Sequence, residues 1–421
     1  MSSGVGRHSA SALDARLDAP GACAGVVGPA GTGKTRMLAA LVELRRDRGQ
    51  PLARCAGRRF EQSPYAAFDR LVPDLPEHDE PAADRRVRAA VEARLEGGGL
   101  LVVDDAHWLD PASLRVTAAL ADRAEEGGWQ VVAAHRPVAR RPELLALDEV
   151  LGRGGALVRL GPLGRDEVAA LASERLRAPA TDELAGVLAY WSGGWPAWAE
   201  RLVAGWAEEG VVVRGQLRRD PAERVPDAVM EVVEGRLAAL DPAERAAVVL
   251  LAVAGDALPS APATDDADAV HAEPPPADTS TATGSTVPAG PRGAALVPLD
   301  PALLAELRAL ALAHPERSEL VPVVVAAARR LVPRAEQDAA RRHLARLAAA
   351  QPGGELAAAQ HLLAAGTVDD EARRAFVLAG ELLAARDPVA ALAWFERAAA
   401  RPRRPASSVD PAGAPVGLGL A

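Results

Sequence analysis

The chain has 421 residues, 49% of them hydrophobic, and a net charge of −9. This length predicts two to four domains with real cores, and the low aromatic content of 3% favours helices. The acidic balance argues against a free-standing DNA-binding domain, which needs concentrated positive charge. The two cysteines suggest buried thiols in a reducing cytosol. A polar start and short apolar runs predict neither a signal peptide nor a membrane span.

Strands alternate with helices up to about residue 160. Continuous apolar runs predict the strands, and helical spacing of apolar residues predicts the helices between them. The predicted strands cover 24–27, 52–56, 100–103, 129–134 and 156–160, and the predicted helices cover 35–44, 87–95 and 114–124. This alternation is typical of βαβ units and predicts an α/β fold with a parallel, three-layer sheet.

After Pro162 the sequence is mostly helical. The predicted helices cover 166–176, 181–191, 195–206, two within 220–255, and then 302–331, 335–347, 356–364, 371–385 and 389–400. The last two resemble one antiparallel helix-pair repeat. Residues 257–293 are rich in Ala, Pro, Thr, Ser and Asp, which predicts a flexible linker or disordered insertion. Residues 401–421 are predicted to be a disordered tail.

The glycine-rich stretch Gly28-Pro29-Ala30-Gly31-Thr32-Gly33-Lys34-Thr35 lies between a predicted strand and a predicted helix. Lys34 is the single lysine of the chain, which also has no Asn and no Ile, as expected from a genome of very high G+C content. Where Arg replaces Lys almost everywhere, the remaining lysine indicates a site that needs a compact ammonium. The pattern predicts a P-loop, in which backbone amides and Lys34 bind the phosphates of ATP and the Thr35 hydroxyl binds Mg²⁺.

A second motif ends the apolar run 100–103. The run is followed by Asp104 and Asp105, so a parallel sheet would place two carboxylates beside the P-loop. Asp104 is predicted to hold Mg²⁺ through water, and Asp105 to orient or deprotonate the attacking water. Asp104 follows Lys34 by seventy residues. This spacing leaves room for a further strand and predicts an ATPase sheet of the additional-strand type.

Several segments resemble, in the same order, the large ATP-binding transcriptional regulators of the LuxR type, which belong to the STAND class of AAA-related signalling ATPases. Asp105 is followed by Ala106-His107-Trp108-Leu109-Asp110, which is similar to the Walker B segment of that family. The other similar segments are Val5-Gly6-Arg7, Pro64-Tyr65-Ala66-Ala67-Phe68, Leu160-Gly161-Pro162-Leu163 with Glu167-Val168, Gly193-Gly194-Trp195-Pro196, and Val225-Pro226 onward to Gly255. The resemblance covers residues 5–255 and weakens over 300–400.

The resemblance implies further site residues. Trp195 and Pro196 belong to the segment that is similar to the lid motif touching the nucleotide base. Arg136 stands at the position of a γ-phosphate sensor, although Ala134 replaces the polar residue usual two places earlier; an exposed strand-end arginine is the alternative. His107 either relays charge near Asp105 or packs beside it, and we favour packing.

The predicted organisation has six parts: a P-loop ATPase core (1–160), a helical lid (161–219), a winged-helix-like start (220–256), a linker or insertion (257–299), a helical repeat-like region (300–400) and a tail (401–421). The fold prediction is therefore an α/β P-loop NTPase followed by an all-α lid, a degenerate winged helix and a TPR-like helical region. The family's usual C-terminal helix-turn-helix is expected to be absent, because the chain ends in a Pro/Ala/Gly-rich segment.

These patterns predict a cytoplasmic molecular switch that binds ATP, ADP and Mg²⁺, hydrolyses ATP slowly and signals to a protein partner through its C-terminal helices. A role in transcriptional regulation is implied by the resemblance. Two alternatives remain open: an origin-recognition-type ATPase for DNA maintenance, which needs a basic winged helix, and a nucleotide-binding scaffold without turnover. We expect no specific DNA binding by this chain alone.

Overall fold

The computed structural model describes residues 4–72, 75, 78–137, 141–153, 157–221, 224–254, 297, 300–366 and 368–400. These residues form two compact units, described here one at a time. The first takes its described residues from 1–255 and 297–333, and the second takes them from 334–421. The insertion predicted over 257–293 and the tail predicted over 401–421 lie outside the described residues.

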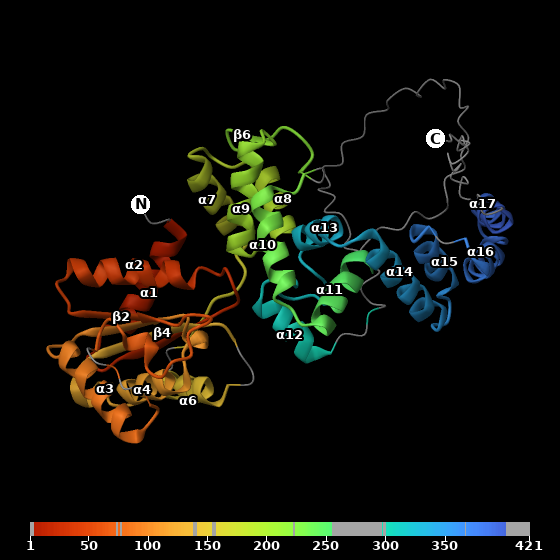
Figure 1. Ribbon diagram of the computed structural model, residues 1–421. Helices are drawn as coiled ribbons and strands as arrows, with labels where there is room; N and C mark the ends of the chain where they lie inside the picture. Colours follow the sequence, from red (N-terminus) through yellow and green to blue (C-terminus); the bar gives the residue numbers. More distant parts are fainter. Residues whose placement is uncertain are drawn as a thin grey trace, which may run out of the picture. The chain divides into compact units, whose positions relative to one another are not determined.

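A five-stranded parallel sheet forms the core of the N-terminal part of the first unit (Figure 1). Its strands are β1 (Cys23–Val27), β2 (Leu52–Ala56), β3 (Leu100–Asp104), β4 (Gln130–His135) and β5 (Leu157–Arg159). The strand order is β2-β3-β4-β1-β5. Thus β4 separates β1, which enters the P-loop, from β3, which ends at the aspartates. The predicted sheet of the additional-strand type is confirmed.

Helices cover both faces of this sheet (Figure 1). The residues of β3 alternate between the two cores, because successive side chains of a strand point to opposite faces. Leu100 and Val102 pack on the side of α1 and α2, and Leu101 and Val103 pack on the opposite side. The covering helices are α1 (Gly4–Arg16) and α2 (Lys34–Asp47) on one face, and α3 (Pro81–Leu95), α4 (Pro111–Asp122), the short α5 (Ala124–Gly127) and α6 (Pro142–Gly152) on the other.

The helices α1 and α6 are additions to the predicted elements. α1 has a polar sequence with a weak apolar pattern, and it is stabilised by tertiary contacts: Leu13 and Leu17 are buried beside α2, and Asp14 forms a buried ion pair of 2.5 Å with Arg45. α6 buries Leu144, Leu147 and Leu151. That spacing is helical and was present in the sequence.

The first unit continues with helices that follow the sheet. They are α7 (Arg165–Leu176), α8 (Asp182–Ser192), α9 (Pro196–Glu208), α10 (Asp227–Ala238), α11 (Pro242–Ala254), α12 (Pro301–Ala309) and α13 (Pro322–Leu331), with a short hairpin of β6 (Val212–Val213) and β7 (Gln216–Leu217) after α9. The helical stretch predicted over 302–331 is interrupted between α12 and α13. There Ala311 has a φ of 53°, and Ala313 pairs with Leu320 in an antiparallel bridge.

The described part of 297–333 therefore belongs to the first unit, whereas the predicted boundary at residue 300 grouped it with the later helices. The reason is packing. α13 lies against α10 and α11, its side chains Val323, Val324 and Ala327 are fully buried, and Arg329 donates a hydrogen bond of 2.8 Å to the carbonyl of Ala252. Thus α12 and α13 belong to the same unit as α10 and α11, and a winged-helix character of residues 220–256 stays a prediction.

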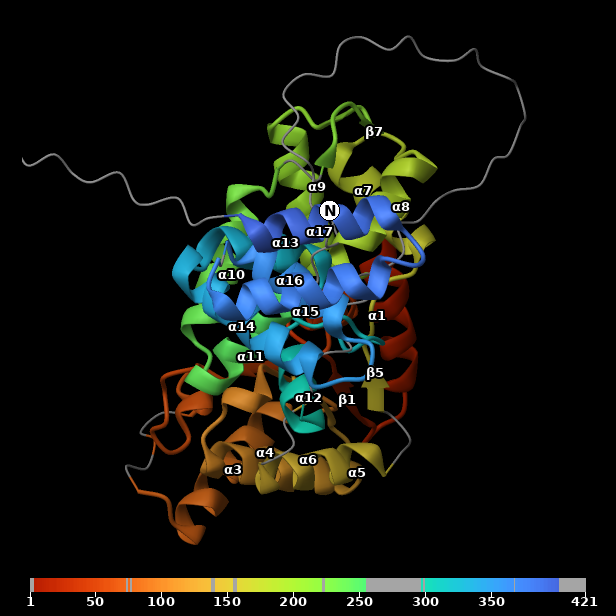
Figure 2. The same ribbon diagram turned by 90° about the vertical axis from the view of Figure 1, so that its right-hand side faces the viewer.

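The second unit is a succession of four helices, each packed against the next (Figure 2). They are α14 (Arg334–Ala349), α15 (Glu355–Ala364), α16 (Asp370–Leu383) and α17 (Pro388–Ala399). Their common core contains Leu362, Phe376 and Trp394 among small alanines. The predicted helical C-terminal region is confirmed. In the described part of the chain, no helix has both the length and the apolar character needed to cross a bilayer.

Candidate functional site

The loop from Gly28 to Thr35 connects β1 to α2. Gly31 and Gly33 have φ values of 75° and 91°, in the left-handed region that strains other residues. A Cβ on Gly28 would lie 2.8 Å from the Thr32 hydroxyl and 2.9 Å from the Leu160 carbonyl, so this position also requires glycine. The amides of Gly31, Thr32 and Gly33 have no hydrogen-bond partner among the described residues. With the N-terminus of α2 they form an arrangement that attracts anions.

The ammonium of Lys34 lies inside this loop. Lys34 is 6% exposed, and its Nζ donates hydrogen bonds of 2.7 Å to the carbonyls of Gly28 and Pro29. The pKa of Lys34 is lowered to about 8, mainly by burial and next by Arg136, while Asp105 and Asp104 oppose the shift. The carbonyls that bond Lys34 are neutral, so an anion that binds beside it would stabilise its buried positive charge.

The two aspartates at the end of β3 face the same region. Asp104 is half-buried, and its Oδ1 accepts a hydrogen bond of 2.9 Å from the amide of Asp105. Asp105 has a φ of 47°, a conformation that costs energy outside glycine and that is concentrated at functional sites. Burial and Asp104 raise the pKa of Asp105, while Arg136 and Lys34 lower it. The structure thus brings Lys34, both aspartates and Arg136 together.

Arg136 follows β4, between β1 and β3. It is half-buried, and burial lowers its pKa while Asp105 raises it. Among the described residues its guanidinium has neither a hydrogen bond nor an ion pair, and its central carbon lies 5.9 Å from the centre of the Trp108 ring. This position fits an arginine that can meet an anion bound at the P-loop.

His107 lies beneath the same turn with its side chain only 3% exposed. Neither ring nitrogen has a hydrogen bond, and Nδ1 lies 3.8 Å from Oδ1 of Asp105. Burial, followed by Arg136 and Lys34, lowers the pKa of His107 to about 3. The burial of the ring and the lack of a hydrogen bond are consistent with packing, which stays a prediction.

The beginning of α9 touches the P-loop directly. The amide of Ala197 donates a hydrogen bond of 3.1 Å to the carbonyl of Gly31, and a Cβ on Gly31 would lie 2.5 Å from that of Ala197. Pro196 is the first residue of α9. Trp195 is 2% exposed, and its indole N–H donates a hydrogen bond of 3.2 Å to the carbonyl of Ala313. The lid segment therefore lies at the loop, and a contact of Trp195 with a base stays a prediction.

The end of α12 also reaches the P-loop, which no sequence pattern indicated. The amide of Ala30 donates a hydrogen bond of 2.8 Å to the carbonyl of Ala309. Two further carbonyls of this segment accept hydrogen bonds: Leu310 from Arg236, and Ala311 from the indole of Trp198 at 2.7 Å. Since the acceptors are backbone groups, any residue could supply them, and the sequence carries no signal for the contact.

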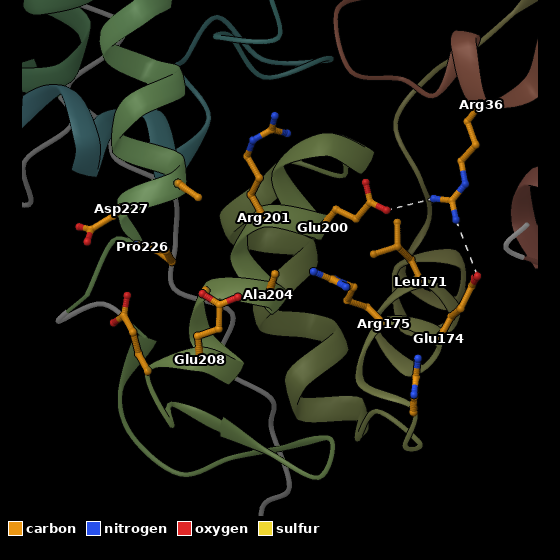
Figure 3. Close-up of a pocket in the computed structure, with 14 residues that line it drawn as sticks. Arg36, Leu171, Glu174, Arg175, Glu200, Arg201, Ala204, Glu208, Pro226 and Asp227 are labelled. Carbon is orange, nitrogen blue, oxygen red and sulfur yellow. Dashed lines mark hydrogen bonds and ion pairs between the residues drawn. The ribbon is translucent and has the colours of Figure 1, made fainter. Parts of the chain in front are cut away.

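Arg36, two residues after Lys34, ties α2 to the lid (Figure 3). Its guanidinium lies 3.7 Å from a carboxylate oxygen of Glu174 on α7 and 3.0 Å from one of Glu200 on α9. These three residues line a polar cavity of about 740 Å³ that also borders α10. Because about two fifths of each side chain is exposed, these ion pairs contribute little to stability.

The sheet order, the P-loop and the aspartates that end β3 define a P-loop NTPase fold of the AAA type. Residues 6–133, less than half of the chain, match the protein family described as AAA ATPase domain. No curated protein matches the chain in sequence. The part of the chain that the structure describes contains no group of three or more His, Cys, Asp or Glu residues that could hold a metal ion without a nucleotide.

Solved structures resemble the chain at low sequence identity. The Orc1 protein of Aeropyrum pernix in complex with DNA is 17% identical, with 58% of this chain and 70% of that chain covered and a TM-score of 0.41. Cdc6p of Pyrobaculum aerophilum is 19% identical, with coverage of 59% and 72% and a TM-score of 0.38. The RuvB Holliday junction branch migration motor of Thermotoga maritima is 16% identical, with coverage of 54% and 72% and a TM-score of 0.33.

Proposed function

We propose that the chain is an ATP-dependent molecular switch that binds Mg-ATP at residues 28–35 and hydrolyses it slowly. The observation that carries this proposal is the state of Lys34. The single lysine of the chain is buried in a glycine loop and bonded only to the carbonyls of Gly28 and Pro29, beside amides that have no partner among the described residues. Phosphate oxygens would satisfy both the ammonium and these amides.

The whole loop takes part in the proposed binding. The amides of Gly31, Thr32 and Gly33 and the first turn of α2 would receive the phosphates, Ala30 and Pro29 would shape the loop, and Lys34 would reach the terminal phosphates. Pro196 and Trp195 would close the side of the site where the base lies, because the start of α9 contacts Gly31. Trp195 would have to release the Ala313 carbonyl to touch the base.

The donors beside the loop fit Mg²⁺. The Thr35 hydroxyl is exposed at the start of α2, and the Asp104 carboxylate is half-buried at the end of β3. Mg²⁺ prefers oxygen ligands and keeps several waters beside one or two carboxylates and the substrate phosphates. Thr35 and Asp104 would hold the ion, and its charge would neutralise part of the charge developing on the phosphates.

Asp105 is proposed to orient the attacking water and accept its proton. Burial raises the pKa of this carboxyl, which makes the carboxylate a stronger base, and the strained backbone keeps it in place. Arg136 would bind the γ-phosphate. Slow turnover suits a switch, because a long-lived ATP state gives a signal time to act.

Two elements contact the P-loop and could transmit the difference between the ATP-bound and ADP-bound states to the rest of the chain. The amide of Ala197 on α9 donates to the carbonyl of Gly31, and the amide of Ala30 donates to the end of α12. A bound phosphate would compete with α12 for the amide of Ala30 and would alter the loop that α9 contacts. The helices α14 to α17 would provide the surface through which a protein partner responds to the bound nucleotide. A role in transcriptional regulation rests on the family resemblance, and the partner rather than this chain would then bind DNA.

An origin-recognition-type ATPase for DNA maintenance is the alternative function. It uses the same nucleotide chemistry and differs in requiring direct DNA contact. The acidic net charge of −9 disfavours it at physiological salt. A scaffold that binds nucleotide without turnover is the third possibility, and intact Asp104 and Asp105 speak against it.

The test is a calorimetric titration of the full chain with Mg-ATP and Mg-ADP, followed by a phosphate-release assay. Saturable binding that is lost in Lys34→Ala, with turnover above buffer, would support the switch. Nucleotide binding without turnover would favour the scaffold alternative. Folded protein that binds neither nucleotide would refute the proposal.

A further inference from the structure

Two arginines from separate loops lie against the ring of Trp108. The guanidinium carbon of Arg59 is 5.5 Å from the ring centre, and that of Arg136 is 5.9 Å away. Arg59 also lies 5.5 Å from the ring centre of Phe60, whose side chain is 90% exposed. We call the series Phe60, Arg59, Trp108 and Arg136 the arginine–aromatic ladder. It leads from solvent to the carboxyl edge of the sheet.

The position of Trp108 is fixed by its own turn. The amide of Trp108 donates a hydrogen bond of 2.8 Å to the carbonyl of Asp105. Arg141 donates hydrogen bonds of 2.6 Å to the carbonyls of His107 and Leu109, one on each side of Trp108. These bonds fix the backbone on both sides of Trp108, and so they hold this residue close to Asp105.

Arg136 is subject to opposing forces at this ring. Asp105 attracts its guanidinium, and Arg59 repels it, as the opposite effects of these residues on the pKa of Arg136 indicate. Among the described residues, neither arginine lies within ion-pair distance of a carboxylate. A guanidinium over an aromatic ring is held by an attraction of moderate strength, which a phosphate can exceed. Arg136 is thus close to Asp105 without being paired to it.

We infer that Trp108 and Arg59 are positioning residues for Arg136, and that together they let the site distinguish a nucleoside triphosphate from a diphosphate. Trp108 holds the guanidinium beside Asp105, and Arg59 adds positive charge that only the terminal phosphate of a triphosphate compensates. The inference rests on the proposed function, because it requires a nucleotide at residues 28–35. It adds two residues, from the loop after β2 and the turn after β3, to the recognition of the third phosphate.

The test compares Arg59→Gln with Arg58→Gln. Both arginines are exposed, and both changes remove one positive charge. Arg58, however, pairs with Asp69 at 3.2 Å and is not stacked on a ring of the ladder. The affinities of the full chain for Mg-ADP and for Mg²⁺ with a non-hydrolysable ATP analogue are measured by calorimetry. The preference for the triphosphate should fall by about threefold to tenfold in Arg59→Gln. It should stay at the wild-type value in Arg58→Gln.

Substitutions of Trp108 provide the second arm. Trp108→Leu should reduce the same preference, and Trp108→Phe should restore part of it, because phenylalanine keeps an aromatic face for Arg136. A merely structural role would lower stability without changing the ratio of the two affinities. Wild-type ratios in Arg59→Gln and Trp108→Leu, or an equal change in Arg58→Gln, would overturn this inference and leave the proposed function standing. Absence of any nucleotide binding by the wild-type chain would overturn both.

Discussion

The amide of Ala30, in the middle of the P-loop, donates a hydrogen bond of 2.8 Å to the carbonyl of Ala309, the last residue of α12. The carbonyl end of a helix carries partial negative charge. It therefore lies at a loop whose amides favour an anion, and it would repel an incoming phosphate. The release of α12 from the loop is a step that nucleotide binding would have to include.

This contact predicts that loosening the α12 segment makes the P-loop more accessible. Trp198→Phe removes the N–H that bonds to Ala311 and keeps most of the ring volume. We expect faster nucleotide association, measured by stopped flow, and a loss of about 1–3 kcal/mol in the free energy of unfolding from the unsatisfied carbonyl. Trp206→Phe is the matched control, because its indole bonds to Arg224 away from the loop. Equal association rates in both variants would contradict the prediction.

Lys34→Ala should abolish detectable binding of Mg-ATP. Each charged hydrogen bond contributes about 1.5–3 kcal/mol, and the ammonium can make at least two to the phosphates, so the affinity should fall by roughly 10²-fold or more. Lys34→Arg should also impair binding or turnover, because a planar fork does not fit where a compact ammonium does. Calorimetry measures the affinities, and circular dichroism confirms folding. Unchanged affinity in a folded Lys34→Ala variant would disprove the assignment of the loop.

Asp105→Asn should keep nucleotide affinity and slow hydrolysis by about 10²-fold to 10⁴-fold, the usual contribution of a general base. Asp104→Asn should instead raise the Mg²⁺ concentration needed for half-maximal turnover. A phosphate-release assay over a Mg²⁺ series separates the two effects. If both variants turn over like the wild type, the carboxylates only end the strand.

The affinity for ATP should decrease as the pH rises through about 8. Burial lowers the pKa of Lys34 to about 8 in the structure without nucleotide, whereas bound phosphate favours the charged ammonium. Below this pH the lysine is already charged; above it, binding must take up a proton, and the affinity can fall by up to about tenfold per pH unit. Titrations at pH 9 in buffers of different ionisation enthalpy should reveal proton uptake. No uptake at pH 9 would show that Lys34 remains charged.

The purified chain alone should not protect a specific DNA sequence in a footprinting assay. Sequence-specific binders make several phosphate contacts with basic residues, and their affinity falls steeply with salt. With a net charge of −9, this chain should give no footprint at physiological salt with ATP present. A sequence-specific footprint from the purified chain would favour the origin-recognition alternative.

The elements that depend on the local pattern of residues could be predicted from the sequence. Buried parallel strands need continuous apolar runs, so β2 has the predicted bounds of Leu52 to Ala56, and β3 ends at the predicted aspartates. The P-loop could be predicted because its chemistry requires specific residue types, glycines with positive φ and one lysine, in a fixed order.

Contacts between groups that are distant in the sequence could not be predicted, because they depend on the tertiary structure. The end of α12 contacts the P-loop through a backbone carbonyl, a group that every residue possesses. The hydrogen bond from the indole of Trp195 to Ala313 likewise ends on a backbone carbonyl of the segment after α12. Arg59 and Arg136 meet at Trp108 because β2, β3 and β4 are neighbours in the sheet and end at one edge. The spacing between Lys34 and Asp104 indicated the additional strand, whereas the meeting of these side chains at one ring depends on long-range packing.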